Sequence, residues 1–130
     1  MTAPVQHPMY IDGQFVTWQG DAWIDVTNPA TEELLSRIPD GTAEDARKAI
    51  DAADKAQPAW EALPAIERAG WLRKIAAGIR ARASEISALI VAEGGKIQQL
   101  ADVEVNFTAD YIDYMSEWRS EEHTSELQSL

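Results

Sequence analysis

The sequence predicts an α+β domain in which a β-hairpin and further edge strands are followed by about four helices. Two features of the chain predict this order. Ahead of Thr42, short runs of β-forming residues are separated by the turn pairs Asp-Gly and Asn-Pro. From Thr42 onward, apolar residues recur at intervals of three and four, which is the spacing of one face of a helix.

The strand region contains two expected antiparallel pairs. Residues 10–16 predict a tight hairpin, because Asp12-Gly13 supplies the positive φ angles of a two-residue turn between β-forming residues. Residues 22–26 and 34–39 predict a second extended pair. The Asn-Pro-Ala-Thr sequence at residues 28–31 favours the turn between them.

The first helix is expected from Thr42 to about residue 56. Thr42 and Asp45 form a variant of the capping box, with Asp in the place usually taken by Glu or Gln. Ala46 then begins a thin stripe of small residues along this helix. Pro58 and Pro64 are expected to bracket a short turn before the second helix.

Three more helices follow, and their apolar faces are expected to face a core. The second begins at Pro64, a residue favoured in the first turn, and the third is capped by Ser84 and ends at Gly94-Gly95. The fourth spans about residues 97–118. On the second helix, the expected core face comprises Trp71, Leu72, Ile75 and Ile79. On the fourth helix, the expected core face comprises Leu100, Phe107, Tyr111, Tyr114 and Trp118. The opposite face of the fourth helix is expected to be exposed to solvent and comprises Asp102, Asn106, Asp110, Asp113 and Glu117.

The last twelve residues, 119–130, do not continue this pattern. They resemble the translation of a sequencing-library adapter, and we interpret them as a non-native tail, outside the fold. The natural part is then residues 1–118. Its net charge is −9, because the tail carries one of the 11 basic and three of the 22 acidic residues.

Composition excludes several classes of function. A net charge of −11 over 130 residues, with no basic cluster, disfavours nucleic-acid binding. The chain has no apolar run of membrane-spanning length and no secretory signal, so no membrane contact and a cytoplasmic location are expected. Zero cysteines exclude a disulfide and a cysteine nucleophile within these residues, and no G-x-G-x-x-G sequence is present.

Four features in order resemble the amino-terminal region of the NAD(P)-dependent aldehyde dehydrogenases. They are Tyr-Ile-Asp-Gly at 10–13, Asn-Pro-Ala-Thr-Glu at 28–32, the helix containing Glu67-Arg68, and Glu-Gly-Gly-Lys at 93–96 followed by Glu104. Further detail at residues 5–10 and 111–115 resembles the bacterial members that act on lactaldehyde and glycolaldehyde.

The resemblance implies an α/β family fold in which residues 1–118 are the N-terminal part of the cofactor-binding domain. It implies a parent enzyme, several times longer and homo-oligomeric, that oxidises small aldehydes to carboxylic acids with NAD. The family chemistry is attack by a cysteine thiolate followed by hydride transfer to the cofactor. The matched residues contain none of the family's catalytic or cofactor-binding motifs, so this chain by itself is expected to be inactive. The choice between NAD and NADP stays open.

Two family sites do fall within these residues. Some members bind a structural Na⁺ or K⁺ through backbone carbonyls before the Asn-Pro turn and an acidic side chain near the Gly-Lys pair, which here are Val26, Thr27 and Glu93. The alternative is that Glu93 merely lies near a helix end. The family's fourth helix also contributes to the substrate tunnel, where this chain has Phe107, with Tyr111 one turn further on. Plain core packing is the alternative there. A different reading of the whole chain is a free-standing helical interaction module that docks through this aromatic stripe.

Overall fold

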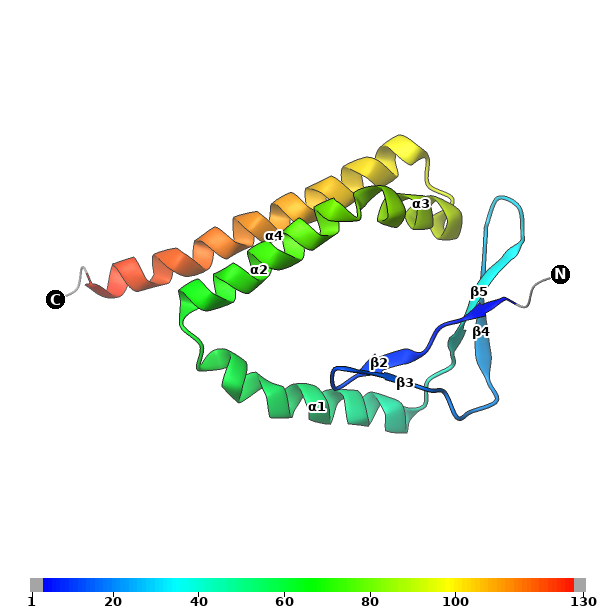
Figure 1. Cartoon of the computed structure of the whole chain (residues 1–130), viewed down its shortest axis with the longest axis horizontal. Helices are drawn as coiled ribbons and strands as arrows, with labels where there is room; N and C mark the ends of the chain where they lie inside the picture. The colour runs from blue at the N-terminus through cyan, green and yellow to red at the C-terminus, as the bar shows by residue number, and fades with distance from the viewer. Residues whose placement is uncertain (1–3, 128–130) are drawn as a thin grey trace. The chain divides into compact units, whose positions relative to one another are not determined.

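The computed structural model describes the backbone of residues 4–127 and the side chains as far as residue 117. The chain divides into two units, residues 1–59 and residues 60–130, which are described separately. All five strands belong to the first unit, and the chain then continues through four helices (Figure 1). The expected order of strands before helices is therefore confirmed.

The predicted hairpin is present. Strands β2 (Met9–Ile11) and β3 (Gln14–Val16) pair in antiparallel register. The two turn residues have positive φ angles, 53° at Asp12 and 74° at Gly13, as a type I′ turn requires. Across the pair, the rings of Tyr10 and Phe15 meet edge to face at 5.1 Å between centroids.

The remaining strands form a three-stranded sheet in the order β1-β5-β4. The predicted antiparallel pair is β4 (Trp23–Thr27) and β5 (Leu34–Pro39), joined also by an ion pair of 2.6 Å between Arg37 and Asp25. Strand β1 (Val5–Gln6) was not predicted. It is two residues long and pairs in parallel with a segment about thirty residues away, so no local pattern indicates it.

The turn between β4 and β5 is fixed by its own hydrogen bonds. The Asn28 side-chain oxygen accepts from the backbone N–H of Ala30 at 2.9 Å, and the Asn28 carbonyl accepts from the N–H of Glu32 at 2.8 Å. Glu32 has a φ of 61°, which closes the turn. The predicted Asn-Pro turn is thus confirmed as an Asx turn that ends the first strand of the pair.

Helix α1 (Ala43–Glu61) begins as predicted and ends later than predicted. The Asp45 carboxylate accepts from the Thr42 hydroxyl at 2.6 Å and from the Thr42 N–H at 2.9 Å, so the capping box is formed. The expected stop before Pro58 is wrong. Pro58 lies three residues from the end of the helix, so only its own backbone hydrogen bond is lost and the last turn still forms.

Helices α2 (Ala65–Ala81), α3 (Ala83–Gly94) and α4 (Gln98–Leu127) make up most of the second unit. Pro64 is the N-cap of α2, one residue earlier than its predicted place inside the helix. Ser84 does not cap α3, whose N-cap is Arg82. Gly95 ends α3 in the left-handed conformation with a φ of 64°, as the glycine pair predicts.

Helix α4 extends nine residues beyond its expected end at residue 118, since no glycine or proline stands between there and Leu127. The side chains from Trp118 onward lie outside the described part of the chain, and with them the side chains of the interpreted tail.

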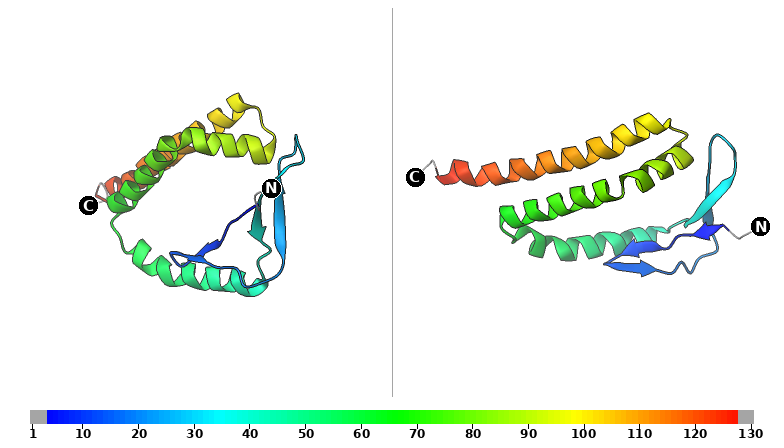
Figure 2. Two further views of the ribbon diagram at one scale, coloured as in Figure 1. Left: turned by 45° about the vertical axis from the view of Figure 1, so that its right-hand side comes forward. Right: turned by 45° about the horizontal axis from the view of Figure 1, so that its top comes forward.

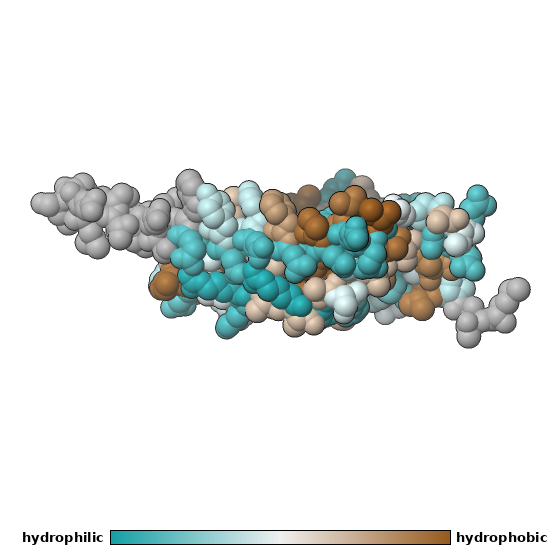
Figure 3. Space-filling model, turned by 90° about the horizontal axis from the view of Figure 1, so that it is seen from above, coloured by the Kyte–Doolittle hydropathy of each residue, from teal (hydrophilic) through white to brown (hydrophobic). Residues whose placement is uncertain are grey.

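Helices α2 and α4 lie side by side and run antiparallel (Figures 1 and 2). The fully buried apolar side chains of this unit are small, and most of the large residues expected to face a core are exposed, while Leu72 and Ile79 are half-buried. Trp71 and Ile75 are about half exposed, and Phe107 is 67% exposed. Apolar side chains accordingly reach the surface of the molecule in several places (Figure 3). The buried apolar residues are Ala65, Ala69, Ala76, Ala101, Val105 and Ala109.

The acidic side chains of α4 form ion pairs with arginines of α2 in addition to their contact with water. Arg80 reaches from α2 to two carboxylates, Asp110 at 2.7 Å and Asp113 at 2.6 Å, and Arg73 reaches Glu117 at 2.9 Å. The hydrogen bonds that the Arg80 guanidinium donates to Asp110 first and to Asp113 second raise the pKa of Arg80. Because these pairs are exposed to water, solvent and salt screen them, and their contribution to stability is small. They fix the register of two antiparallel helices more than they stabilise them.

Among residues 4–127, no helix is both long enough and apolar enough to span a bilayer.

The alanine interface predicts a sharp difference between two adjacent positions. Ala76 is fully buried and Ala77 is exposed, so Ala76→Leu inserts three carbon atoms where there is no room. We expect Ala76→Leu to lower the stability of the helices by about 1–3 kcal/mol. Ala77→Leu is the matched control and is expected to change stability by less than about 0.5 kcal/mol. Urea unfolding followed by far-UV circular dichroism measures both; equal midpoints for the two variants would contradict the interface.

Candidate functional site

The first part of the predicted cation site is the end of β4. Val26 pairs with Ser36 and Thr27 pairs with Leu34, so Leu35 is an extra residue and the register shifts between Val26 and Thr27. Such an irregularity interrupts the regular ladder of backbone hydrogen bonds. Val26 is half-buried and Thr27 is exposed, immediately before the Asx turn.

The second part is Glu93, in the last turn of α3. Its side chain is exposed, and the helix ends two residues later at Gly95. The two parts belong to different units, so the structure describes each of them by itself. Carbonyl and carboxylate oxygens are the ligands that hard cations prefer. Their convergence on one ion therefore stays a prediction.

The predicted tunnel residues stand on an exposed face of α4. The rings of Phe107 and Tyr111 are stacked, with centroids 6.2 Å apart and an angle of 21°, and the ring of Tyr114 follows at 6.5 Å from that of Tyr111. Phe107 is 67% exposed and Tyr111 is 50% exposed. These rings are thus not part of the core of this chain, and they present a continuous aromatic surface to whatever covers α4.

A polar cluster around the buried Ser87 joins α3 to α4, and it was not predicted from the sequence. Ser87 is fully buried, donates a hydrogen bond to the Asp102 carboxylate at 2.5 Å and accepts one from the Gln98 amide at 2.7 Å. The Ser87 hydroxyl, and after it the Gln98 amide, lower the pKa of Asp102. The available signal was Ser87 itself, a polar residue inside an otherwise apolar helical run.

The turn between α3 and α4 is held by an ion pair as well. The Lys96 ammonium contacts the Glu104 carboxylate across it. Together with the Ser87 cluster, this pair fixes the start of α4 against α3. These contacts thereby fix the position of Glu93 on α3 relative to the aromatic side chains on α4.

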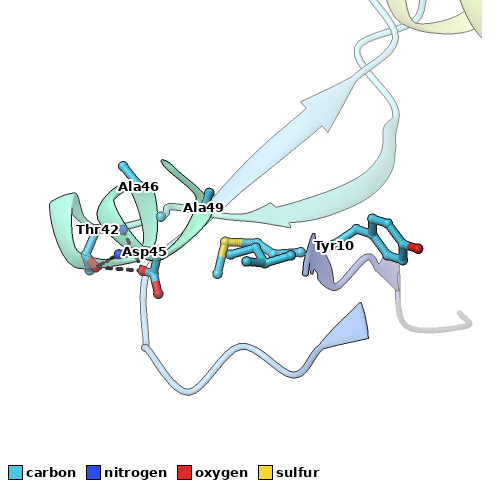
Figure 4. A pocket seen from close by; sticks show the side chains of 8 residues that line it. Tyr10, Thr42, Asp45, Ala46 and Ala49 are labelled. Carbon is cyan, nitrogen blue, oxygen red and sulfur yellow. Dashed lines mark hydrogen bonds between the residues drawn. The ribbon is translucent and has the colours of Figure 1, made fainter. Parts of the chain in front are cut away.

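A separate cavity of about 360 Å³ lies in the first unit, between β2 and α1. Figure 4 shows Thr42, Asp45, Ala46 and Ala49 along one side of it, with the Tyr10 ring directed away from the capping box. Asp45 is engaged by Thr42, whose hydroxyl and N–H lower the pKa of that carboxyl. The lining offers a mostly apolar surface, and we assign no chemistry to it.

Within the part of the chain that the structure describes, no group of three or more His, Cys, Asp or Glu side chains is arranged to hold a metal ion.

The chain belongs to the aldehyde dehydrogenase family, whose sequence profile matches residues 15–129. It is 85% identical to lactaldehyde dehydrogenase of Escherichia coli (strain K12) over 118 residues, which is 91% of this chain and 25% of that protein. The chain thus spans about a quarter of the length of the relatives it matches.

The structure supports the same assignment. A crystal structure of lactaldehyde dehydrogenase from Escherichia coli superimposes with a TM-score of 0.89 at 83% identity, covering 91% of this chain and 25% of that one. A crystal structure of an NAD-dependent aldehyde dehydrogenase from Sinorhizobium meliloti superimposes with a TM-score of 0.82 at 31% identity, covering 88% and 24%. The α/β family fold expected from the resemblance is confirmed.

The Ser87 cluster predicts a pH dependence of stability. The pKa of Asp102 is lower in the folded chain, so its charged form stabilises the fold above the unfolded pKa, and this contribution is lost as the pH falls through the folded pKa. We expect Asp102→Asn to lower the urea midpoint at pH 7. The difference from the unchanged chain should shrink below about pH 4.

The control for this experiment is Asp51→Asn, which changes an exposed carboxyl on α1. It is expected to leave the midpoint close to that of the unchanged chain at pH 7. A deficit of Asp102→Asn that stays constant from pH 7 to pH 3 would show that the charge of Asp102 does not matter.

Proposed function

We propose that this chain is the N-terminal quarter of an enzyme that oxidises small aldehydes, lactaldehyde and glycolaldehyde among them, to carboxylic acids with NAD. The observation that carries the proposal is the 85% identity to lactaldehyde dehydrogenase over 118 residues. The similar enzyme from Sinorhizobium meliloti is described as NAD-dependent, which supports NAD or NADP as the hydride acceptor.

The catalytic nucleophile of such an enzyme lies outside these residues. The family uses a cysteine thiolate, and the chain has no cysteine. NAD, when bound by the remainder of the enzyme, accepts the hydride. What these residues contribute is shape: Phe107 and Tyr111 line the entrance to the reacting centre and select aldehydes by size.

A structural Na⁺ or K⁺ is part of the same proposal. The ligands are the carbonyl oxygens of Val26 and Thr27 and the carboxylate of Glu93, a set of hard oxygen donors. The shifted register at Val26 and the left-handed end of α3 after Glu93 support it, because each part is fixed by its own turn. In a crystal structure of the longer enzyme, these oxygens should surround one point; a Glu93 directed away from Val26 would remove the site.

The proposal also covers the C-terminal segment 119–130 and the location and oligomeric state of the parent enzyme. We interpret segment 119–130 as a non-native tail on its own residues alone, because they do not continue the apolar spacing of the helix before them; the family profile itself extends to residue 129. Residues 1–118 then form the N-terminal part of the cofactor-binding domain. We place the parent enzyme in the cytoplasm as a homo-oligomer that binds neither nucleic acid nor membrane.

The first prediction compares the activity of residues 1–130 with that of the full-length enzyme. Purified residues 1–130 should form no NADH from lactaldehyde above background, because the chain has no cysteine to supply the thiolate nucleophile. The full reading frame, recovered by sequencing genomic DNA past codon 118, should restore NADH formation with lactaldehyde and glycolaldehyde. A native stop codon near that point, or turnover by residues 1–130, would overturn the proposal.

The second prediction concerns substrate size. In the full-length enzyme, Phe107→Ala should change kcat/KM unequally for short and bulky aldehydes, because a wall contact discriminates by about 1–3 kcal/mol per group. Val103→Ala, an exposed position one turn away on α4, is the comparison variant. Equal effects of Phe107→Ala on all aldehydes would mean that its ring only packs.

A further inference from the structure

Three side chains hold the start of α4 against α3, close to the turn that joins the two helices (Figure 1). They are Ser87 on α3 and Gln98 and Asp102 on α4, and we call them the Ser87 cluster. We propose that the Ser87 cluster positions the Phe107 ring in the longer enzyme and thereby sets the choice of aldehyde. Asp102 is then a positioning residue, and this inference rests on the substrate role proposed for Phe107.

The three hydrogen bonds of the cluster close on one another. The Ser87 hydroxyl donates to the Asp102 carboxylate at 2.5 Å, and the Gln98 amide donates to the Ser87 hydroxyl at 2.7 Å and to the same Asp102 oxygen at 2.9 Å. Two of the three bonds end on a charged carboxylate, and such bonds are about twice as strong as neutral ones. Since Ser87 is fully buried, water does not replace a partner that is removed.

The cluster is complete within residues 87–102. Its three hydrogen bonds join side chains of this chain alone, and Ser87 is already fully buried by the described residues. Further residues can cover α4 without taking part in these bonds. The fold of the helices is shared with a much longer enzyme, of which this chain covers 25%. We therefore expect the Ser87 cluster to be present in the full-length enzyme as well.

The cluster acts on Phe107 through the rigid backbone of α4. Asp102 and Phe107 are five residues apart within one helix, with no proline or glycine between them. At about 100° per residue, their side chains stand about 140° apart around the helix. The tip of a side chain lies about 5–6 Å from the helix axis, so a rotation of α4 by about 10° moves the Phe107 ring by about 1 Å.

The ion pairs between α2 and α4 are weaker attachments than the cluster. Arg80 binds Asp110 and Asp113, which stand three and six residues beyond Phe107. These charged side chains are exposed, so water and salt screen their interaction. The Ser87 cluster has a fully buried hydroxyl at its centre and lies on the other side of Phe107 along the helix. Its loss therefore frees the start of α4, and the Phe107 ring moves with it.

A displaced ring changes the selectivity of the enzyme. Wall contacts separate substrates by size, and a misplacement of about 1 Å near a reacting centre can change a rate by up to about 10²-fold. Removal of the cluster should act in the same direction as removal of the Phe107 ring, because both withdraw the wall from its place.

Aldehyde selectivity in the full-length enzyme is the first measurement. The ratio of kcat/KM for glycolaldehyde to that for benzaldehyde should shift in Asp102→Ala and in Ser87→Ala by about three- to tenfold, in the direction of Phe107→Ala. Asp102→Asn keeps an oxygen that accepts from Ser87 and loses the charge, so its shift should be smaller. An unchanged ratio in both Asp102→Ala and Ser87→Ala would overturn the proposal.

Glu85→Gln is the matched control, because it also removes a hydrogen-bonded carboxylate from this pair of helices. Glu85 binds Arg82, the N-cap of its own helix α3, at 2.6 Å. The variant should leave the ratio unchanged. A shift equal to that of Asp102→Ala would show that the contact between α3 and α4 is not what matters.

The shift should also pass through the ring. In an enzyme that already carries Phe107→Ala, adding Asp102→Ala should leave the ratio unchanged, because there is no ring left to displace. A variant that is only destabilised would change the ratio by the same factor in both backgrounds, and that result would contradict a positioning role.

Crystal structures of the full-length enzyme with and without Asp102→Ala test the placement independently of activity. Superimposed on α3, they should show the Phe107 ring displaced by about 0.5–1 Å. An enzyme that oxidises neither aldehyde would refute the function proposed above, and the two structures would still decide whether the cluster positions the ring. A Phe107 ring that stays in place in Asp102→Ala would overturn the inference.

Discussion

The close approach of α2 and α4 decides how the second unit is built. Ala69, Ala76, Ala101 and Ala109 are fully buried, and side chains of that size let two helix backbones come near each other. No large side chain fits between them, so the large apolar residues of both helices lie on the outer faces. Arg80 then fixes the register, because its two amino groups bind carboxylates that stand three residues apart on α4.

The alanine interface between α2 and α4 buries less apolar surface than the large side chains on the outer faces would bury if they were covered. Apolar burial contributes about 25 cal/mol per Å², and an alanine brings little area. The rings of Phe107 and Tyr111 bring far more and remain exposed in this chain. The apolar surface that α4 presents therefore gains from any partner that covers it.

Most features that depend on neighbouring residues were predicted from the sequence, although the helix stop before Pro58 and the Ser84 cap were wrong. Contacts between segments that are distant in the sequence were mostly not predicted. The Asp12-Gly13 turn, the Thr42–Asp45 cap and the glycine end of α3 follow from local chemistry. The pairing of β1 with β5 and the hydrogen bond from Ser87 to Asp102 join segments that no periodicity connects. Helical spacing also indicates that α4 has an apolar face without indicating what covers it, and most of that face is exposed in the structure.

The candidate sites also differ in whether they depend on neighbouring residues or on distant ones. The backbone at Val26 and the helix end at Glu93 are each shaped by local hydrogen bonds or a left-handed residue, so sequence motifs identify the two parts separately. Their meeting on one ion depends on how the two units pack, which no motif specifies. The aromatic surface of α4 differs, because stacking at 6.2 Å between Phe107 and Tyr111 is set within a single helix. The arrangement of these two rings therefore does not depend on the residues that pack against α4. The role in substrate selectivity that we propose for Phe107 and Tyr111 rests on this preformed arrangement of the two rings.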